Sequence, residues 1–424
     1  MSVKTASADV AATFQRALHD ASFSHQDTLG LAVSGGGDSI ALMHLAAQVR
    51  DPHKLRAITV NHGLRPEARE EIALVSVQAG QLGIPHTVVD WEWDGTGNLQ
   101  AAARDGRWAA LRAWALAHNL REVWLGHTED DQVETVLMRL ARGSGIDGLR
   151  AMYPHSTRDG LHILRPLLGC ARADLRAWLA DNKIGWCDDP SNEDPRFDRV
   201  RARQMFSQLE ALGLTRKRLL QTIDHMQAAH ISLQTAAQAF AKRHVRQDAG
   251  DLLFAPEALD LEKADAPRRV MAAGFAWVGN RTYRPRFEQL QATVEQARQG
   301  ATVTLGGCIM TPADGGVVRL MREAAATKAV QRDAGIPDTK GVFWDSRWFL
   351  EGPLEGDMVY KALGEGITQC PDWRASGMPR VSLLASPAVW QSGALVAAPL
   401  AGLSNGWSAR IVADFHTSAF AIED

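Results

Sequence analysis

The chain has 424 residues, of which 46% are hydrophobic and 22% are charged, and its formal net charge is -3. This length exceeds what one compact core of ordinary size accommodates, so we expect two or three domains. The composition is that of a soluble globular protein and excludes the disordered and collagenous classes. A membrane-spanning class is also excluded, because no window reaches the roughly 18 uninterrupted apolar residues that a bilayer span needs.

Targeting and redox features point to the cytoplasm. The first twenty residues lack the apolar core of a signal peptide. The cysteines are scattered and include no C-x-x-C pair, which argues against a disulfide framework or a zinc site; they are Cys170, Cys187, Cys308 and Cys370. Because the net charge is slightly negative, any binding of nucleic acid must rest on a local basic surface.

From residue 28 to 185, short β-branched runs alternate with longer amphipathic stretches. Strands are predicted at 28–34, 55–62, 86–93 and 122–127, and helices at 39–49, 67–83, 99–119 and 130–142. This alternation is typical of a parallel sheet covered by helices. We therefore predict an α/β fold with a doubly wound, Rossmann-like parallel sheet whose ligands collect at the carboxyl ends of the strands.

The rest of the chain divides by pattern. Residues 187–199 concentrate Pro, Asp, Asn and Ser, which indicates the exit from the first domain. A helical period follows, including a long helix over 214–245, and short strand-like runs separated by turns begin after residue 300. We predict a first domain at 1–205 that contains the parallel sheet, a helical domain at 206–300 and a small α+β domain at 301–424.

A glycine-rich segment directly follows the first predicted strand and precedes a helix. Three glycines let the backbone approach a ligand closely, and the helix start presents free amides and a positive dipole end to an anion. The segment therefore predicts a phosphate cradle, although a tight strand-to-helix turn without a ligand is the structural alternative. Its residues are Ser34, Gly35, Gly36, Gly37, Asp38 and Ser39.

Asp38 stands where a Walker loop carries the lysine that reaches the β- and γ-phosphates. A carboxylate beside a polyphosphate is repelled unless a divalent cation lies between them. Asp38 therefore predicts bound Mg²⁺, and it favours adenylation over ordinary γ-phosphoryl transfer.

An acidic helix start follows the fourth predicted strand. His127 lies at the end of that strand, and Asp130, Asp131 and Glu134 open the next helix. Close like charges repel unless a cation sits among them, although early acidic residues also complement a helix dipole. We expect Asp38, His127, Asp130, Asp131 and Glu134 to be catalytic, with Asp38, Asp131 and Glu134 holding the metal.

These motifs resemble those of the PP-loop, or N-type, ATP pyrophosphatase superfamily. Residues 126–135, G-H-T-E-D-D-Q-V-E-T, resemble the motif of the tRNA(Ile)-lysidine synthetases and their tRNA-thiolating relatives. Further matches to the lysidine family follow in the same order at 61–65, 142–149, 165–168 and 186–192. One departure is Val200, which stands where the family usually has Asn.

The resemblance implies a ligase that adenylates the wobble cytosine of tRNA(Ile) with a CAU anticodon. Free L-lysine then displaces AMP to give lysidine, with ATP and Mg²⁺ as cofactors. The resemblance also implies that 1–205 is a PP-loop ATP-binding catalytic domain with ATP on residues 34–39, and that the helical domain at 206–300 contacts the tRNA. His62 is expected close to the nucleotide, since the family has a similar element there. Either a carboxylate or His127 could accept the proton of the lysine amine. No membrane partner is expected, and a homodimer is compatible with the sequence.

The densest basic stretch begins near residue 196 and suits contact with the tRNA backbone. The candidate tRNA-binding residues are Arg165, Arg199, Arg201 and Arg203. The alternative is a solvated helix face, which is what most runs of charge are.

Three other functions fit parts of the pattern. A tRNA-thiolating enzyme usually needs clustered cysteines, which this chain lacks. An amidotransferase-type ligase needs a glutaminase half, and none is recognisable here. A catalytically silent nucleotide-sensing RNA-binding module would have no reason to keep every motif carboxylate.

Overall fold

The computed structural model describes residues 3–21, 27–61, 63, 68–93, 95, 99–158, 160–188, 198–281, 285–328, 330–331, 341–354 and 357–421. The chain forms two compact units, one within Met1–His230 and the other within Ile231–Ala421. The border between them falls inside α9 (Arg216–His244). This helix confirms the long helix predicted over 214–245. The three-part division at residues 205 and 300 stays a prediction.

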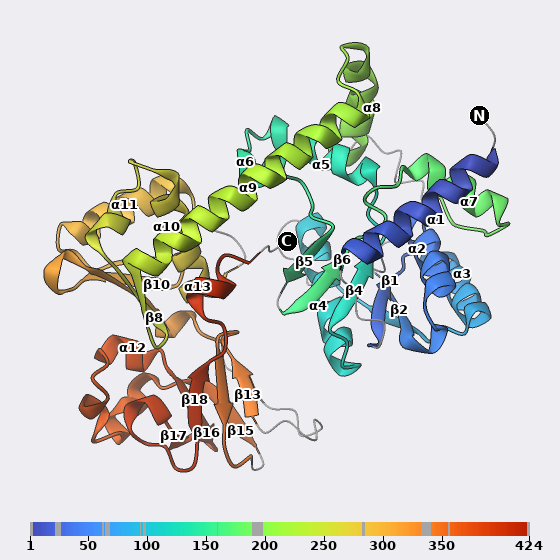
Figure 1. The fold of residues 1–424 in the computed structure, drawn as a ribbon. Coiled ribbons are helices and arrows are strands. Elements are labelled where there is room, and N and C mark those ends of the chain that lie inside the picture. The colour runs from blue at the N-terminus through green and yellow to red at the C-terminus, as the bar shows by residue number, and fades with distance from the viewer. Residues whose placement is uncertain are drawn as a thin grey trace. The chain divides into compact units, whose positions relative to one another are not determined.

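The first unit is built on a mixed sheet, six-stranded in the described part of the chain, with the order β3-β2-β1-β4-β6-β5. All neighbouring strands run parallel except β5 and β6, which form an antiparallel hairpin. Figure 1 shows this sheet with helices on its faces. The strands are β1 (Leu29–Ala32), β2 (Leu55–Asn61), β3 (His86–Asp90), β4 (Glu122–Leu125), β5 (His155–Arg158) and β6 (Leu161–Leu164). The predicted doubly wound α/β sheet is confirmed, and the hairpin is an addition that the sequence did not predict.

Apolar faces of helices cover both sides of this sheet. On one face, residues of α1, α2, α3 and α7 share a core with β1 and β4. On the other face, α4 packs Leu111 and Trp114 against Ile58 and Val123. The helices are α1 (Val3–Asp20), α2 (Gly37–Val49), α3 (Ala68–Leu82), α4 (Leu99–Ala117), α5 (Glu129–Ala141), α6 (Ile146–Leu149), α7 (Arg172–Asp181) and α8 (Asp198–Ala211). Burial of each large apolar side chain contributes about 2 kcal/mol, so this packing fixes where the strand ends lie.

The second unit contains three antiparallel sheets among its described residues, ordered β7-β8-β11-β10-β9, β12-β15-β16-β17 and β13-β14-β18. The strands are β7 (Val245–Asp248), β8 (Asp251–Phe254), β9 (Val303–Leu305), β10 (Cys308–Pro312), β11 (Val318–Arg322), β12 (Val330–Gln331), β13 (Gly341–Trp344), β14 (Trp348–Glu351), β15 (Met358–Ala362), β16 (Pro387–Gln391), β17 (Ala394–Ala397) and β18 (Ser408–Ile411). The helices are α10 (Asp265–Gly279), α11 (Phe287–Arg298), α12 (Arg380–Leu384) and α13 (Phe415–Ser418). The region predicted as helical therefore also contains the hairpin of β7 and β8.

Buried ion pairs join the elements of the second unit. Arg319 on β11 donates hydrogen bonds of 2.7 Å to Asp251 on β8 and to Asp248 on β7. Asp251 also accepts a 2.5 Å hydrogen bond from Ser382 of α12. Because Asp251 is buried, its charge needs these partners. Across the described residues of both units, no helix combines the length and the apolar character that crossing a bilayer would take.

Candidate active site

The sheet order identifies where a ligand should bind. Strands β1, β2 and β3 extend the sheet in one direction, whereas β4 and β6 extend it in the other, so the order reverses between β1 and β4. Figure 1 shows β1 and β4 side by side. In open α/β sheets the ligand crevice lies at the carboxyl ends of the strands at such a reversal. The glycine-rich loop follows β1 and the acidic segment follows β4, so both lie at this point.

The glycine-rich loop is held in shape by its own backbone and hydroxyl groups. Gly35 has a φ of +89°, and a Cβ at this position would lie 3.0 Å from Cβ of Glu71. Ser39 Oγ donates to the carbonyl of Gly36 over 2.9 Å and accepts from the backbone N–H of Ser34 over 3.1 Å. Gly36 is the N-cap of α2 and offers no side-chain cap. The N–H groups of Gly37 and Asp38 precede the first backbone hydrogen bonds of α2, which Ser39 and Ile40 donate to Gly36. Such amides at a helix start suit the binding of an anion.

A segment from much later in the chain supports this loop. Gly36 and Cys187 form a parallel β-bridge, and the Cys187 N–H donates to the Gly35 carbonyl over 3.0 Å. Gln78 of α3 donates to the carbonyl of Gly185 over 2.7 Å. The segment around Trp186 and Cys187 therefore packs against the glycine-rich loop.

The start of α5 lies against the start of α2. A Cβ on Gly126 would lie 3.0 Å from the Asp38 carbonyl oxygen, so a larger residue would force the backbone at Asp38 to shift. Thr128 caps α5, and Asp131 Oδ2 accepts from both the Thr128 N–H and the Thr128 hydroxyl, at 2.9 and 3.0 Å. One oxygen of Asp131 therefore has a capping role, and the other remains for the site.

Arg172, at the first position of α7, lies among the predicted carboxylates. Its Nε donates to Asp38 Oδ2 over 3.0 Å, and its two Nη groups contact Glu134 Oε1 and Asp131 Oδ1 at 3.4 Å each. Burial would lower the pKa of Arg172, but Asp38 and Asp131 outweigh it and raise the pKa. The structure therefore brings Asp38, Asp131 and Glu134 together around a residue that the sequence reasoning missed.

Asp130 is oriented by two different partners. Its Oδ1 accepts from Nη2 of Arg216 on α9, and its Oδ2 accepts from the backbone N–H of Arg172, each over 2.8 Å. Burial acts to raise the pKa of Asp130, yet these hydrogen bonds outweigh it and lower the pKa. Asp130 is thus a stable carboxylate that ties α5 to α7 and α9.

Asp38 is electrostatically different from Asp130. Burial raises the pKa of Asp38, Arg172 opposes the rise, and the nearby charges of Asp131 and Asp130 add to it. Arg203 of α8 contributes further positive charge, because its Nε and Nη2 bind Glu134 Oε1 at 3.0 and 2.7 Å. The site is therefore an alternating set of acids and arginines gathered from α2, α5, α7 and α8.

His127 lies beside these acids and arginines, but its Nδ1 hydrogen-bonds to none of them. Its Nδ1 is buried without a hydrogen-bond partner in the described structure. Burial lowers the pKa of His127 to about 4, against an opposing effect of Asp131. The imidazole is therefore neutral at pH 7 and holds an added proton only weakly, which makes it a poor final acceptor for the proton of an amine.

Comparisons with known proteins agree with this geometry. A family model described as a PP-loop domain matches residues 6–210. The tRNA(Ile)-lysidine synthase of Ruegeria pomeroyi is 43% identical, over 92% of this chain and 93% of its own length. The chain belongs to the tRNA(Ile)-lysidine synthase family. A second synthase, from a Bradyrhizobium species, is 36% identical over 72% of this chain and 90% of its own length.

Among solved structures, a U34-tRNA thiolase of Methanococcus maripaludis has a TM-score of 0.45 and 15% sequence identity. It covers 53% of this chain and 80% of its own.

The three carboxylates that were predicted to hold Mg²⁺ do not fit a shared metal site in this lysidine synthase family member. Asp38, Asp131 and Glu134 each face a different nitrogen of the Arg172 guanidinium. Within the described ranges, no three His, Cys, Asp or Glu side chains are grouped so that they could hold one ion. Arginines supply the positive charge beside these acids: Arg172 contacts all three, and Arg203 also binds Glu134.

The predicted tRNA contacts have different outcomes. Arg165 is only 1% exposed, and its Nη1 donates to Tyr153 and Ser156 over 3.0 Å each. The structure contradicts the prediction that Arg165 contacts tRNA, because its guanidinium is buried and bonded inside the protein. Arg199 and Arg201 have exposed side chains on α8 and remain candidates. His62, predicted near the nucleotide, lies outside the described residues.

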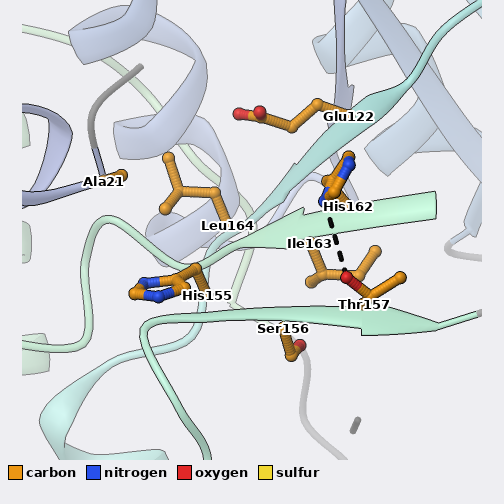
Figure 2. Close-up of a pocket in the computed structure, with 8 residues that line it drawn as sticks. All are labelled: Ala21, Glu122, His155, Ser156, Thr157, His162, Ile163 and Leu164. Carbon is orange, nitrogen blue, oxygen red and sulfur yellow. Dashed lines mark hydrogen bonds between the residues drawn. The ribbon is translucent and has the colours of Figure 1, made fainter. Parts of the chain in front are cut away.

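A separate pocket has a volume of about 310 Å³ and includes no residue of the glycine-rich loop. Figure 2 shows the side chains that line it. It includes Glu122, the first residue of β4, whereas the candidate site lies beyond the last residue of that strand. The side chains of Thr157 and His162 approach each other there at 3.5 Å. Its lining residues are Ala21, Glu122, His155, Ser156, Thr157, His162, Ile163 and Leu164. The pocket includes none of the predicted site residues.

Proposed function

We propose that this member of the lysidine synthase family joins free lysine to the wobble cytosine of tRNA(Ile) with a CAU anticodon, using ATP to activate the base. The observation that carries the proposal is that two segments of the chain meet at one place in the fold. The glycine-rich loop after β1 and the acidic start of α5 after β4 converge at the reversal of the sheet, in a chain related to these synthases over 92% of its length.

The loop suits the phosphates of ATP. Gly36 caps α2 without a side chain, so the amides at the helix start can donate to phosphate oxygens. Gly35 has the positive φ that lets the chain turn tightly there. The Ser39 hydroxyl donates to the Gly36 carbonyl, so Ser39 stabilises the shape of the loop. A phosphate chain seated here lies next to Asp38 and the cluster around Arg172.

Two bond exchanges make up the reaction. The cytosine 2-oxo oxygen attacks the α-phosphorus of ATP, an O–P bond forms, and pyrophosphate leaves. The neutral ε-amine of lysine then attacks C2 of the base, a C–N bond forms, and AMP leaves with the oxygen. The amine must first lose a proton, since its ordinary pKa is about 10.4. An unpaired anticodon base can turn out of its stack to reach the site.

The arginines of α8 suit the approach of the tRNA backbone. Arg199 and Arg203 are on the side of α8 that meets the acids, with contacts to Asp131 and Glu134. Arg201 pairs instead with Asp198, and its side chain is 62% exposed. We assign phosphate contact to Arg201 and the outer parts of Arg199 and Arg203, beside the carboxylates where the base would react.

The test is incorporation of lysine into tRNA. The full chain is incubated with ATP, radiolabelled lysine and a tRNA(Ile) transcript with a CAU anticodon, and the modified nucleosides are separated. We expect label in a cytidine-derived nucleoside, with AMP and pyrophosphate formed only when both tRNA and lysine are present. The matched control is the same tRNA with uracil in place of the wobble cytosine, which should take up no lysine.

Other outcomes would contradict the proposal. Formation of a thiolated nucleoside when a sulfide donor replaces lysine in the incubation would indicate a thiolating enzyme. ATP binding without AMP formation would indicate a nucleotide-sensing module. The proposal includes a cytoplasmic location, with which the four free thiols of Cys170, Cys187, Cys308 and Cys370 are in keeping.

A further inference from the structure

Arg172 is fixed at both of its ends. Its backbone N–H donates to Asp130 Oδ2 over 2.8 Å. Its guanidinium touches Asp38 at 3.0 Å and Asp131 and Glu134 at 3.4 Å each. The side chain is 19% exposed, so it is largely removed from solvent. A side chain anchored in this way has a defined position before any substrate binds.

The location of Arg172 in its helix is electrostatically unfavourable by itself. A cation in the first turn of a helix faces the positive end of the helix dipole. Arg172 is the first residue of α7, so the nearby carboxylates must outweigh that repulsion. They come from α2 and α5, the two helices that meet at the reversal of the sheet. Arg172 and Asp38 are 134 positions apart in the chain, so tertiary packing creates this contact.

The carboxylates are spaced for a guanidinium. Each of the three acids meets a different nitrogen of Arg172, whereas Mg²⁺ requires oxygens about 2.0 to 2.1 Å from one centre. Moving the guanidinium aside would leave its charge partly buried without partners, which is unfavourable. Protein sites for Mg²⁺ in nucleotide enzymes commonly use one or two carboxylates together with the phosphates.

We infer that Arg172 is a positioning residue, the permanent cation of the acidic cluster, and that it replaces a three-carboxylate metal site. It holds Asp38, beside the phosphate loop, at a fixed distance from Asp131 and Glu134. A divalent cation therefore binds together with ATP and does not bind the ligand-free acids. The part of this inference that concerns turnover rests on the proposed function, because that function names the reaction. The part that concerns metal binding does not.

Binding of Mn²⁺ to the ATP-free protein tests the inference without any turnover. Free Mn²⁺ is followed by electron paramagnetic resonance during titration of the full chain, with no nucleotide or tRNA present. We expect the natural protein to bind Mn²⁺ only weakly, and Arg172→Met to bind it at least tenfold more tightly, because the three carboxylates have lost the one cation that contacts all of them. Arg203 still pairs with Glu134, and Arg199 still lies 3.9 Å from Asp131, in both proteins. Equal, tight binding by both proteins would overturn the inference, because the guanidinium would then yield to the metal.

The matched control is Arg176→Met, one turn later on α7. Arg176 pairs with Asp188 at 2.6 Å, and both side chains are exposed by 46% or more. This variant removes an arginine and an ion pair from the same helix without touching the cluster, so its Mn²⁺ affinity should equal that of the natural protein. A gain like that of Arg172→Met would assign the effect to net charge and refute the positioning role.

Asp38→Asn provides an answer even if Arg172→Met fails to fold. If Arg172 is the resident cation, neutralising one carboxylate leaves the weak Mn²⁺ binding of the ATP-free protein unchanged. If the acids share a metal site, the same change weakens Mn²⁺ binding at least tenfold.

Kinetics separate positioning from general structure. Arg172→Met should lower kcat for tRNA- and lysine-dependent AMP formation at least 100-fold while retaining the natural circular dichroism spectrum, and Arg172→Lys should recover part of it. Failure of lysine incorporation by the natural protein would refute the proposed function alone, since the Mn²⁺ titrations do not depend on it. An unchanged kcat in Arg172→Met would overturn the inference.

Discussion

Arg203 donates two hydrogen bonds to one oxygen of Glu134, from Nε at 3.0 Å and from Nη2 at 2.7 Å. The other oxygen of Glu134 is buried without a partner in the described structure. The same bonded oxygen also faces Arg172 at 3.4 Å. One buried carboxylate therefore balances two arginines that come from different helices, α7 and α8.

Replacing Glu134 with Gln should destabilise the first unit. The change keeps the shape but removes the charge that both arginines share, and breaking a buried ion pair of this kind costs about 2 to 4 kcal/mol, with the exposure of Arg203 favouring the lower value. The free energy of unfolding in urea at pH 7 measures it. The control is Glu295→Gln, whose exposed pair with Arg298 should be worth less than about 1 kcal/mol. Equal losses in both variants would contradict the shared role.

Gly35→Ala should impair the phosphate loop. The residue has a φ of +89°, and an added Cβ would meet Glu71 at 3.0 Å, so the loop must move. We expect a stability loss of about 1 to 2 kcal/mol and at least a tenfold weaker affinity for ATP, measured by denaturation and calorimetry. Gly160→Ala is the control, because its φ is +79° but no atom lies within 4 Å of its Cβ position. If Gly160→Ala weakened ATP binding equally, the loop would not be responsible.

His127 should make stability depend on acid pH. Its folded pKa of about 4 lies below the ordinary value of 6.5, so between these pH values the unfolded chain binds more protons. Stability should therefore fall as the pH drops from 6.5 towards 4, by up to about 3 kcal/mol from this residue. His127→Asn removes the dependence. Urea unfolding of both proteins at pH 7 and pH 5 measures the difference, and parallel losses in the two would refute it.

Arg201→Ala should weaken tRNA binding in a salt-dependent way. Its side chain is 62% exposed and lies on the same helix as Arg199 and Arg203. If it neutralises one phosphate, its removal should reduce the slope of log K against log salt by about 0.7 to 0.9. Filter binding of tRNA(Ile) at several salt concentrations gives the slope. Arg298→Ala removes an arginine of the second unit whose side chain is 52% exposed, and it should leave the slope unchanged.

Asp251→Asn should destabilise the second unit without affecting nucleotide binding. Asp251 is buried and accepts from Arg319 and Ser382, so the change should lower the free energy of unfolding by about 2 to 4 kcal/mol. Asp248→Asn alters a carboxylate that binds the same arginine but is 33% exposed, and it should cost less than about 1 kcal/mol. Calorimetric titration with ATP should give the natural affinity for both variants. A loss of ATP affinity in Asp251→Asn would contradict this separation.

Local pattern was sufficient to predict β1 to β4 and the helices that follow them, because alternating runs and glycine turns are encoded within a few residues. The hairpin of β7 and β8 was missed. Its strands are four residues long, and its two-residue turn has Ala249, with a φ of +51°, where hairpins favour Asn, Asp or Gly.

The structure brings together Asp38, Asp131 and Glu134, as expected, but Arg172 lies among them where the sequence analysis placed Mg²⁺. Arg172 acquires its partners from α2 and α5, and no spacing in the sequence reports such a contact. One signal was present once α7 is known, which is a basic residue at the first position of the helix, where the dipole disfavours it. Arg165 shows the converse, since an arginine in a family motif was assigned to RNA although its burial depends on the packing around β5 and β6.

The bridge between Gly36 and Cys187 has a consequence for how the protein is made. The ribosome delivers the loop early and its supporting segment much later, with most of the first unit between them. A growing chain can form β1 and α2 but cannot brace the turn between them until the stretch around Cys187 has emerged. The capacity to hold a nucleotide should therefore arise late in translation, almost together with the completed sheet.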